Sequence, residues 1–271
     1  MTDQYAVIGN PIAQSKSPII HAAFARQLGH DLSYEALLAE VDDFDATVRG
    51  FIARGGKGMN VTAPFKLQAL ALSDRLSARA QAAQAVNTLS FTPDGILGDN
   101  TDGLGLVQDI RDQIGKPLAG ARVLLVGAGG AARGVLLPLL QAGPRQLLLL
   151  NRSVEKARAL IAPWAGAYPV AAGDLAAGAG GRFDVVINAT SAGLSAQGLD
   201  LGAGLYAPDA LAYDMVYGKG DTPFMADARR QGAARVADGL GMLVGQAAES
   251  FVIWRGVRPD VAAVRALLRQ Y

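Results

Sequence analysis

Three polar side chains stand inside an apolar stretch near position 60. Residues 58–66, GMNVTAPFK, place Asn60, Thr62 and Lys66 in a pattern typical of a buried strand that runs into a turn. Residues two apart in a strand point to the same side, so Asn60 and Thr62 are expected to share a face. A buried amide or hydroxyl without a partner costs about 1–3 kcal/mol, so these groups must either satisfy the protein's own backbone or bind a ligand.

Lys66 follows Pro64, which must end the strand because proline cannot donate to a sheet. A strand end of this kind opens onto the ligand crevice of an α/β sheet. The chain has six lysines against nineteen arginines, so a lysine at this place suggests a use for its titratable amine. A solvated lysine at the start of a helix explains the residue equally well.

Two further polar clusters could complete a site. The segments LGDNTDG (97–103) and AVNT (85–88) bring four polar residues and Asn87 next to apolar runs. The segment QSKSP (14–18) places Ser15 and Ser17 at the start of a predicted helix, whose free N–H groups could bind a carboxylate with the serine hydroxyls. An Asx-rich turn and an ordinary N-cap at Ser17 are the alternatives.

Composition excludes several other kinds of site. The 271 residues carry a net charge of +1, and no run of Lys and Arg is dense enough to follow a nucleic-acid backbone. The absence of cysteine excludes disulfides, thiol catalysis and Cys-bound zinc, and the presence of only two histidines argues against a His-rich metal site, so no metal is expected. The sequence shows neither a signal peptide nor a membrane span, which predicts a cytoplasmic protein.

The order of apolar patterns predicts two α/β domains with a boundary near residues 103–119. Before it, we expect strands at 5–10, 32–39 and 58–63, helices at 17–29, 44–56 and 66–84, and a hairpin within 85–103. From residue 120, five near-continuous apolar runs, mostly separated by helical stretches, are typical of parallel strands covered on both faces. The last thirty residues read as helices that return to the first domain.

A glycine turn indicates a dinucleotide site in the second domain. In VLLVGAGGAARGVLLPLL (123–140), Gly127, Gly129 and Ala132 fit G-x-G-x-x-A between a strand and a helix. The alternative is an ordinary tight turn. The next strand ends in Asn151, Arg152 and Ser153 instead of the acidic residue that binds the ribose of NAD, and Lys156 follows one turn later. Cationic groups suit a 2′-phosphate, so NADP is preferred to NAD.

Eight motifs occur in an order that resembles the shikimate and quinate dehydrogenase family across essentially the whole chain. They are GNPIAQSKSP, GMNVTAPFK, AVNT, GDNTDG, VGAGGAAR, NATSAG, YDMVY and ADGLGMLVGQAA. The resemblance implies a substrate-binding and catalytic domain at 1–103 plus about 240–271, and a Rossmann-type NADP-binding domain at 104–239. It also implies NADPH-linked reduction of 3-dehydroshikimate to shikimate in aromatic biosynthesis, by a monomer or homodimer.

The resemblance implies a role for each site residue. Lys66 and Asp102 resemble the catalytic pair of the family. The substrate would be held by Ser15 and Ser17 at its carboxylate and, around the ring, by Asn60, Thr62, Asn87, Asp102, Tyr217 and Gln246. The cofactor would contact Gly127, Ala128, Gly129, Gly130, Ala131, Asn151, Arg152, Ser153, Lys156, Met215 and Gly239. One departure is Gln84, where the family often has glycine.

The residue types suit this chemistry, because a ketone needs a hydride on carbon and a proton on oxygen. A protonated lysine can supply the proton, whereas a free lysine, with a pKa of about 10.4, is a poor base at neutral pH. Other interpretations remain open: an enzyme of mixed shikimate and quinate or mixed cofactor specificity, a methylenetetrahydrofolate dehydrogenase, and a non-catalytic NADPH-binding regulator. The last of these would predict a broken Lys66–Asp102 pair.

Overall fold

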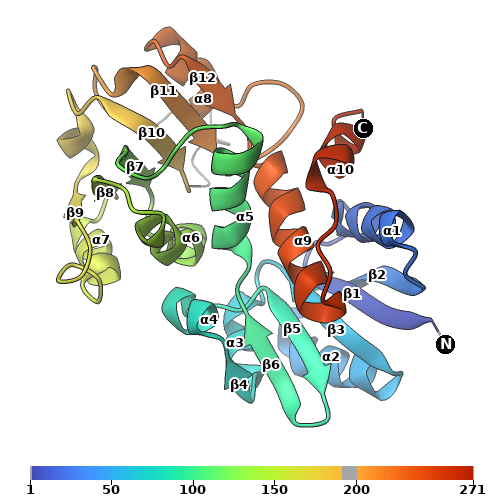
Figure 1. Ribbon diagram of the computed structural model, residues 1–271. Helices are drawn as coiled ribbons and strands as arrows, with labels where there is room; N and C mark the ends of the chain where they lie inside the picture. Colours follow the sequence, from blue (N-terminus) through green and yellow to red (C-terminus); the bar gives the residue numbers. More distant parts are fainter. Residues whose placement is uncertain (1, 191–199, 271) are drawn as a thin grey trace. The chain divides into compact units, whose positions relative to one another are not determined.

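The computed structural model describes residues 2–190 and 200–270. The chain divides into two compact units, 1–105 with 244–271, and 106–243. Each unit contains its own six-stranded sheet (Figure 1). The two divisions fall inside the helices α5 (Asp102–Gln108) and α9 (Leu240–Arg255), so the C-terminal helices belong mainly to the first unit, as the sequence predicted.

The first unit has a mixed sheet with the strand order β2-β1-β3-β5-β6-β4. Strand β1 pairs in parallel with β2 and β3, and β5 pairs antiparallel with β3 and β6. The predicted strands and the predicted hairpin are confirmed, with β3 ending two residues earlier than expected. The strands are β1 (Asp3–Gly9), β2 (Leu32–Leu38), β3 (Gly56–Val61), β4 (Arg75–Leu76), β5 (Thr88–Thr92) and β6 (Gly95–Asp99).

Helices cover both faces of this sheet. On one face, Phe44 and Phe51 of α2 pack with Ile8 of β1 in a buried cluster that also contains Phe65. On the other face, Trp254 of α9 stacks on Tyr5 of β1. The helices, with one 3₁₀ turn, are α1 (Ser17–Leu28), η1 (Val41–Asp43), α2 (Phe44–Ala53), α3 (Lys66–Leu72), α4 (Ala78–Ala83), the later part of α9, and α10 (Val261–Leu268).

The single helix predicted over 66–84 is wrong. The chain forms α3, the short strand β4 and α4 there, because polar side chains compete for the backbone between the two helices. The Asp74 carboxylate accepts a hydrogen bond from the backbone N–H of Ile96 at 2.7 Å, and the Ser77 hydroxyl caps α4 by accepting from Ala80 N–H. Helix α4 ends at Gln84 with φ 50°, in the left-handed region that favours glycine.

The second unit has an all-parallel sheet with the order β12-β11-β10-β7-β8-β9, the doubly wound arrangement of dinucleotide-binding folds. The five predicted runs are confirmed as β7, β8, β10, β11 and β12, whereas the sixth strand, β9, was not predicted. Strand β9 is short and contains alanine and glycine, which give little β signal. The strands are β7 (Arg122–Val126), β8 (Gln146–Leu150), β9 (Val170–Gly173), β10 (Phe183–Asn188), β11 (Tyr206–Asp214) and β12 (Arg235–Ala237).

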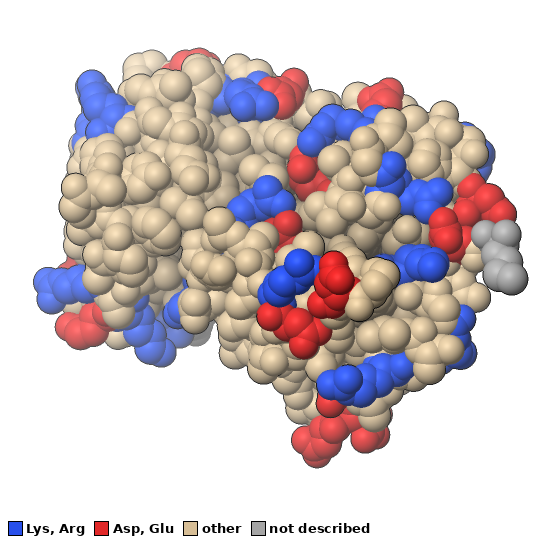
Figure 2. Space-filling view, turned by 60° about the horizontal axis from the view of Figure 1, so that its bottom comes forward, with Lys and Arg blue, Asp and Glu red and all other residues tan. Residues whose placement is uncertain are grey.

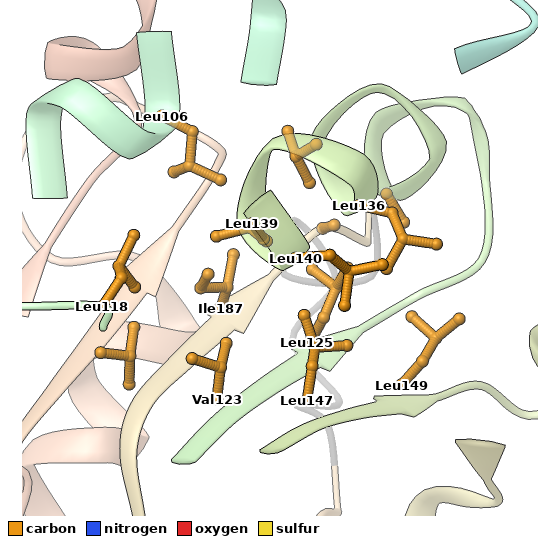
Figure 3. Packing of buried hydrophobic residues seen from close by; sticks show 14 of the residues in the cluster. Leu106, Leu118, Val123, Leu125, Leu136, Leu139, Leu140, Leu147, Leu149 and Ile187 are labelled. Carbon is orange, nitrogen blue, oxygen red and sulfur yellow. The ribbon is translucent and has the colours of Figure 1, made fainter. Parts of the chain in front are cut away.

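Leucine-rich packing holds α6, the helix that follows the glycine turn, against the sheet of this unit. Leu136 and Leu139 of α6 lie over Leu125 of β7 and Ile187 of β10 (Figure 3). The opposite face of the sheet packs on α8, through Phe224. The helical segments of the unit are the end of α5, a π-helical turn (Asp109–Gln113), α6 (Gly130–Gln141), α7 (Val154–Ile161), η3 (Leu175–Gly178), α8 (Pro223–Arg230) and the start of α9.

Charged side chains of both signs are interspersed on the face drawn in Figure 2, and no continuous basic band crosses it. Over residues 2–190 and 200–270, no helix has the length and apolar character needed to span a bilayer. In the same part of the chain, no three His, Cys, Asp or Glu side chains are grouped so that they could hold a metal ion.

His21 lies in the aromatic layer between α1 and the sheet. Its ring stacks on Tyr34 with 4.2 Å between centroids, and Phe251 and Trp254 also lie nearby. Among the described residues, its Nε2 has no partner with hydrogen-bond geometry, although the Asn60 side chain is close enough to oppose the effect of burial. Burial dominates and lowers the pKa of His21 from 6.5 to about 3.

His21 should therefore make the protein sensitive to acid. Its pKa is lower in the folded state than in the unfolded state, so its contribution to stability is present above pH 6.5 and is lost as the pH falls towards about 3. The loss is roughly 5 kcal/mol over that window. In urea unfolding at a series of pH values, His21→Phe should lose less stability than the wild type between pH 6.5 and 4.

The control is His30→Phe, which keeps His21; its pH dependence should differ from that of the wild type by less than that of His21→Phe does. Parallel curves for the wild type and His21→Phe would contradict the assignment.

Candidate active site

An ion pair joins the two residues predicted to act together. Lys66 Nζ lies 2.6 Å from Asp102 Oδ2, although 36 residues separate them in the chain. Lys66 begins α3 directly after the turn at Pro64, and Asp102 begins α5, where the helix dipole favours a carboxylate. The lysine side chain keeps 32% of its surface exposed, whereas the aspartate keeps 11%. The amine is thus accessible and the carboxylate is largely enclosed.

Asn87 holds the second oxygen of this carboxylate. Its Nδ2 donates to Asp102 Oδ1 at 2.9 Å and to Thr101 Oγ1 at 2.9 Å, and it lies 3.2 Å from Gln246 Oε1. Its Oδ1 accepts from the hydroxyl of Thr88 and from the backbone N–H of Thr101. Asn87 and Gln246, both predicted as site residues, therefore contact the same cluster as the ion pair.

The GDNTDG segment is a buried structure and not a solvated turn. Asp99, Asn100, Thr101 and Asp102 are each at most 8% exposed. Asn100 Oδ1 accepts from the backbone N–H of Asp102 and its Nδ2 donates to Ala85 O, so local Asx bonds shape the segment. These bonds fix the start of α5 and with it the direction of the Asp102 side chain.

The structure also shows how the amide of Asn60 is satisfied. Its Nδ2 lies 2.8 Å from Ser250 Oγ and 3.2 Å from both Asn87 O and Thr88 Oγ1, and its Oδ1 accepts from Tyr34 at 2.7 Å. Both ends of this amide are therefore engaged by the protein's own groups. Thr62 lies one residue beyond β3, and its hydroxyl has no hydrogen-bond partner within the described part of the chain.

Ser15 lies two residues before α1, and Ser17 is the first residue of that helix. The backbone N–H of Ser17 donates to Ser15 Oγ at 3.3 Å. The expected N-cap at Ser17 is wrong, because the N-cap position is Lys16, which makes no side-chain capping bond.

The glycine turn of the second unit has the features of a phosphate site. Gly127 has φ 110°, and a Cβ on it would lie 3.1 Å from Ala189 O, so the close approach to the neighbouring loop needs glycine. A Cβ on Gly129 or Gly130 would meet nothing within 4 Å, so the backbone at the start of α6 is open to a ligand. Gly129 is the N-cap and makes no side-chain cap, which leaves the first N–H groups of this 12-residue helix to bind a phosphate.

Cationic side chains flank the end of β8. Arg152 and Lys156 are exposed, and neither has an ion-pair partner in residues 2–190 and 200–270. Asn151 Nδ2 donates to Ser153 O, which stiffens the turn into α7. The cationic groups fit a 2′-phosphate, and the Glu155 carboxylate of the same turn accepts from the Ser153 hydroxyl at 3.4 Å.

The ends of β11 and β12 bring two other predicted cofactor residues together. A Cβ on Gly239 would collide with Met215 O, and the backbone N–H of Gly239 donates to Val216 O at 3.0 Å. Buried Asp214 fixes this segment by accepting from Val216 N–H, from Asn188 Nδ2 and from Thr222 Oγ1. Tyr217 follows, 37% exposed, and desolvation raises its pKa.

Comparison with known proteins identifies the family of this chain. Three family models match: the shikimate dehydrogenase substrate binding domain over residues 7–89, shikimate / quinate 5-dehydrogenase over 109–196, and the shikimate 5'-dehydrogenase C-terminal domain over 239–269. A curated relative from Aromatoleum aromaticum, shikimate dehydrogenase (NADP(+)), is 63% identical over 99% of this chain and 97% of its own length. The chain belongs to the shikimate dehydrogenase family.

Solved structures of similar proteins have the same fold. An Ael1 enzyme from Pseudomonas putida is 50% identical, with a TM-score of 0.91 over 98% of both chains. Shikimate 5-dehydrogenase from Thermus thermophilus, in complex with NADP(H) and shikimate, is 32% identical, with a TM-score of 0.87 over 99% of both chains. The family fold has an N-terminal substrate-binding domain and a Rossmann-type domain for NADP, and this chain has both.

Sequence reasoning missed several residues that organise the site. Tyr34 and Ser250 both bond to Asn60, and Thr88 links Asn60 to Asn87. The sequence gives no signal for Tyr34, because a tyrosine is common in a strand. Ser250 could have been found, because it is a polar residue in the apolar run of α9. The last three residues of the NATSAG motif, 191–193, lie outside the described residues.

Proposed function

We propose that this chain catalyses the reversible NADPH-linked reduction of 3-dehydroshikimate to shikimate, in the pathway to aromatic amino acids. The observation that carries the proposal is the Lys66–Asp102 ion pair at 2.6 Å, with Asn87 on the second carboxylate oxygen. Membership of the shikimate dehydrogenase family, shown by relatives named NADP(+)-dependent, supports the substrate and the cofactor.

Lys66 is the acid in this proposal. Its ammonium group donates a proton to the ketone oxygen as negative charge develops there, and the Asp102 carboxylate directs the amine. The partly exposed lysine side chain allows the proton to be replaced from solvent after each turnover. In the oxidative direction the same amine accepts the proton of the alcohol, by microscopic reversibility.

In this proposal, mostly uncharged side chains bind the substrate. Ser15 and Ser17 hold the carboxylate of shikimate with the N–H groups at the start of α1. The ring hydroxyls are held by Thr62, Asn87, Asp102, Gln246 and Tyr217, and by Asn60, whose Oδ1 has a second lone pair beside the bond from Tyr34. The free hydroxyl of Thr62 and the clustered Asn87 and Gln246 support this assignment most directly.

The second unit supplies the groups that would hold NADPH. The backbone from Gly127 to Ala131 receives the pyrophosphate, and Asn151, Arg152, Ser153 and Lys156 receive the 2′-phosphate. Met215 and Gly239 form the wall for the nicotinamide. When bound, NADPH supplies the hydride. The proposed domain limits are 1–103 with about 240–271 for substrate and 104–239 for the cofactor; a cytoplasmic location and a monomeric or homodimeric state stay predictions from the sequence.

A matrix of two substrates against two cofactors tests the function. Shikimate and quinate are each oxidised with NADP⁺ and NAD⁺, and the change in absorbance of the nicotinamide is followed. We expect kcat/KM to be highest for shikimate with NADP⁺ by at least about tenfold, because hydrogen bonds to charged groups discriminate by about 1.5–3 kcal/mol. Equal rates with quinate would favour the enzyme of mixed specificity, and no turnover in any combination would favour a regulator.

Replacement of Lys66 tests the acid. Lys66→Ala should lower kcat by roughly 10²- to 10⁴-fold while the dissociation constant for shikimate, measured by calorimetry, changes little. The control is Lys57→Ala, which removes an exposed lysine from β3 and should retain wild-type turnover. A Lys66→Ala enzyme that keeps most of its turnover would end the acid assignment.

Arg152 should determine the preference for NADP. Arg152→Ala should raise KM for NADP⁺ by about 10- to 100-fold, the loss expected for charge-assisted hydrogen bonds to a phosphate, and should leave KM for NAD⁺ nearly unchanged. The matched control is Arg158→Ala, which removes an exposed arginine from α7, the helix that follows Arg152. Equal losses for both cofactors would argue against phosphate recognition by Arg152.

A further inference from the structure

Tyr34 links segments of the first unit that are far apart in sequence. It lies in the middle of β2, at the edge of the sheet, and its hydroxyl reaches past β1 to Asn60 on β3. Its ring lies flat against His21 of α1, with an interplanar angle of 5°. The ring and the hydroxyl are therefore held independently, one by stacking and the other by hydrogen bonding.

The hydroxyl of Tyr34 has two polar neighbours. It donates to Asn60 Oδ1 at 2.7 Å. The Ser17 side chain lies close enough to oppose the effect of burial on the pKa of Tyr34. Ser17, the first residue of α1, is therefore next to the phenol of the neighbouring strand.

The bond to Asn60 fixes which way that amide faces. With Oδ1 bound to the phenol, Nδ2 must point to Asn87 O, Thr88 Oγ1 and Ser250 Oγ. Thr88 then donates to Asn87 Oδ1, and Asn87 donates to Asp102. A hydrogen-bonded path therefore runs from Tyr34, beside Ser17, to the ion pair, through Asn60, Thr88, Asn87, Asp102 and Lys66.

The protonation states of the neighbours suit this role. Tyr34 is half-buried as a residue, but desolvation of its hydroxyl raises its pKa well above 10, so the phenol stays a donor across the working range. The stacked His21 is neutral because burial lowers its pKa to about 3. Neither group adds a charge next to the serines.

We propose that Tyr34 is a positioning residue that sets Ser17 and Asn60 for binding of the substrate carboxylate and ring. The inference rests on the proposed function, since it assigns Ser17 to the carboxylate of shikimate. Tyr34 acts through its hydroxyl, and its ring serves the packing of α1 on the sheet.

Tyr34→Phe removes the hydroxyl and keeps the stack on His21. We expect KM for shikimate to rise by about tenfold, the change that corresponds to loss of one well-made hydrogen bond, with KM for NADP⁺ close to wild type. The urea midpoint should fall modestly, because the buried Asn60 Oδ1 loses its partner. Tyr5→Phe is the matched control, because Tyr5 pairs with Tyr34 in the β1–β2 register and stacks on Trp254 in the same aromatic layer. Its hydroxyl lies 3.5 Å from Arg255, away from this path, so its KM for shikimate should stay within about twofold of wild type.

A double-mutant cycle with Ser17→Ala separates positioning from general packing. If Tyr34 acts partly through Ser17, the increase in KM for the double variant is smaller than the product of the single effects. A Tyr34→Phe enzyme with unchanged KM for shikimate, or with equal increases in KM for shikimate and NADP⁺, overturns the proposal. Failure of the proposed function is distinct, because the wild-type enzyme itself would then not oxidise shikimate.

Discussion

The arrangement of the first unit depends on one contact, between the charged amine of Lys66 and the carboxylate of Asp102. At an effective dielectric constant of about 20, the attraction between Lys66 and Asp102 amounts to a few kcal/mol. Enclosing the carboxylate costs free energy, and this cost is offset only if its remaining lone pairs are also satisfied. Asn87 donates to the second oxygen and so offsets part of the free-energy cost of enclosing the carboxylate. The ion pair therefore requires that three separate chain segments meet.

The sheet brings these segments together. Antiparallel pairing of β5 with β6 sets Thr88 opposite Asp99, so the residues before β5 lie beside those after β6. The backbone N–H of Asn87 donates to Asp99 O at 3.0 Å, which locks this approach. Helix α9 adds Gln246 and Ser250, and their spacing of four residues places them on one helix face. Each polar group of the cluster thus comes from an element whose position is fixed by apolar packing elsewhere.

Much of this could be predicted from the sequence, for a physical reason. Parallel strands buried on both faces leave continuous apolar runs, and a glycine turn before a helix leaves a distinct pattern, so the second unit was predicted except for the alanine-rich β9. Helix breaks made by single side-chain contacts leave no such pattern. The division of 66–84 depends on Asp74 finding a partner on β6, which lies elsewhere in the fold, and on Ser77 capping α4, which follows directly.

The site, like the fold, could be predicted from the sequence only in part. Residue types indicated that Asn60, Asn87, Lys66 and Asp102 carry chemistry, but no sequence pattern shows which polar group satisfies which. The amide of Asn60 depends on Tyr34, an edge-strand residue whose spacing resembles any half-buried strand position. Partners of this kind are set by strand order and register, and these follow from tertiary packing and not from local propensity.

The two aspartates of the GDNTDG segment, Asp99 and Asp102, pair with different cations. Asp99 accepts two bonds from the guanidinium of Arg79, at 3.1 and 2.6 Å, and one from Ser77. Arginine stays charged at any working pH and binds a carboxylate through a rigid fork, so this pair is suited to structure. Asp102, three residues later, faces an amine that can release its proton. Because each enclosed carboxylate needs its own cation, pairing Asp99 with arginine leaves Asp102 to pair with the lysine, the arrangement that the proposed acid chemistry requires.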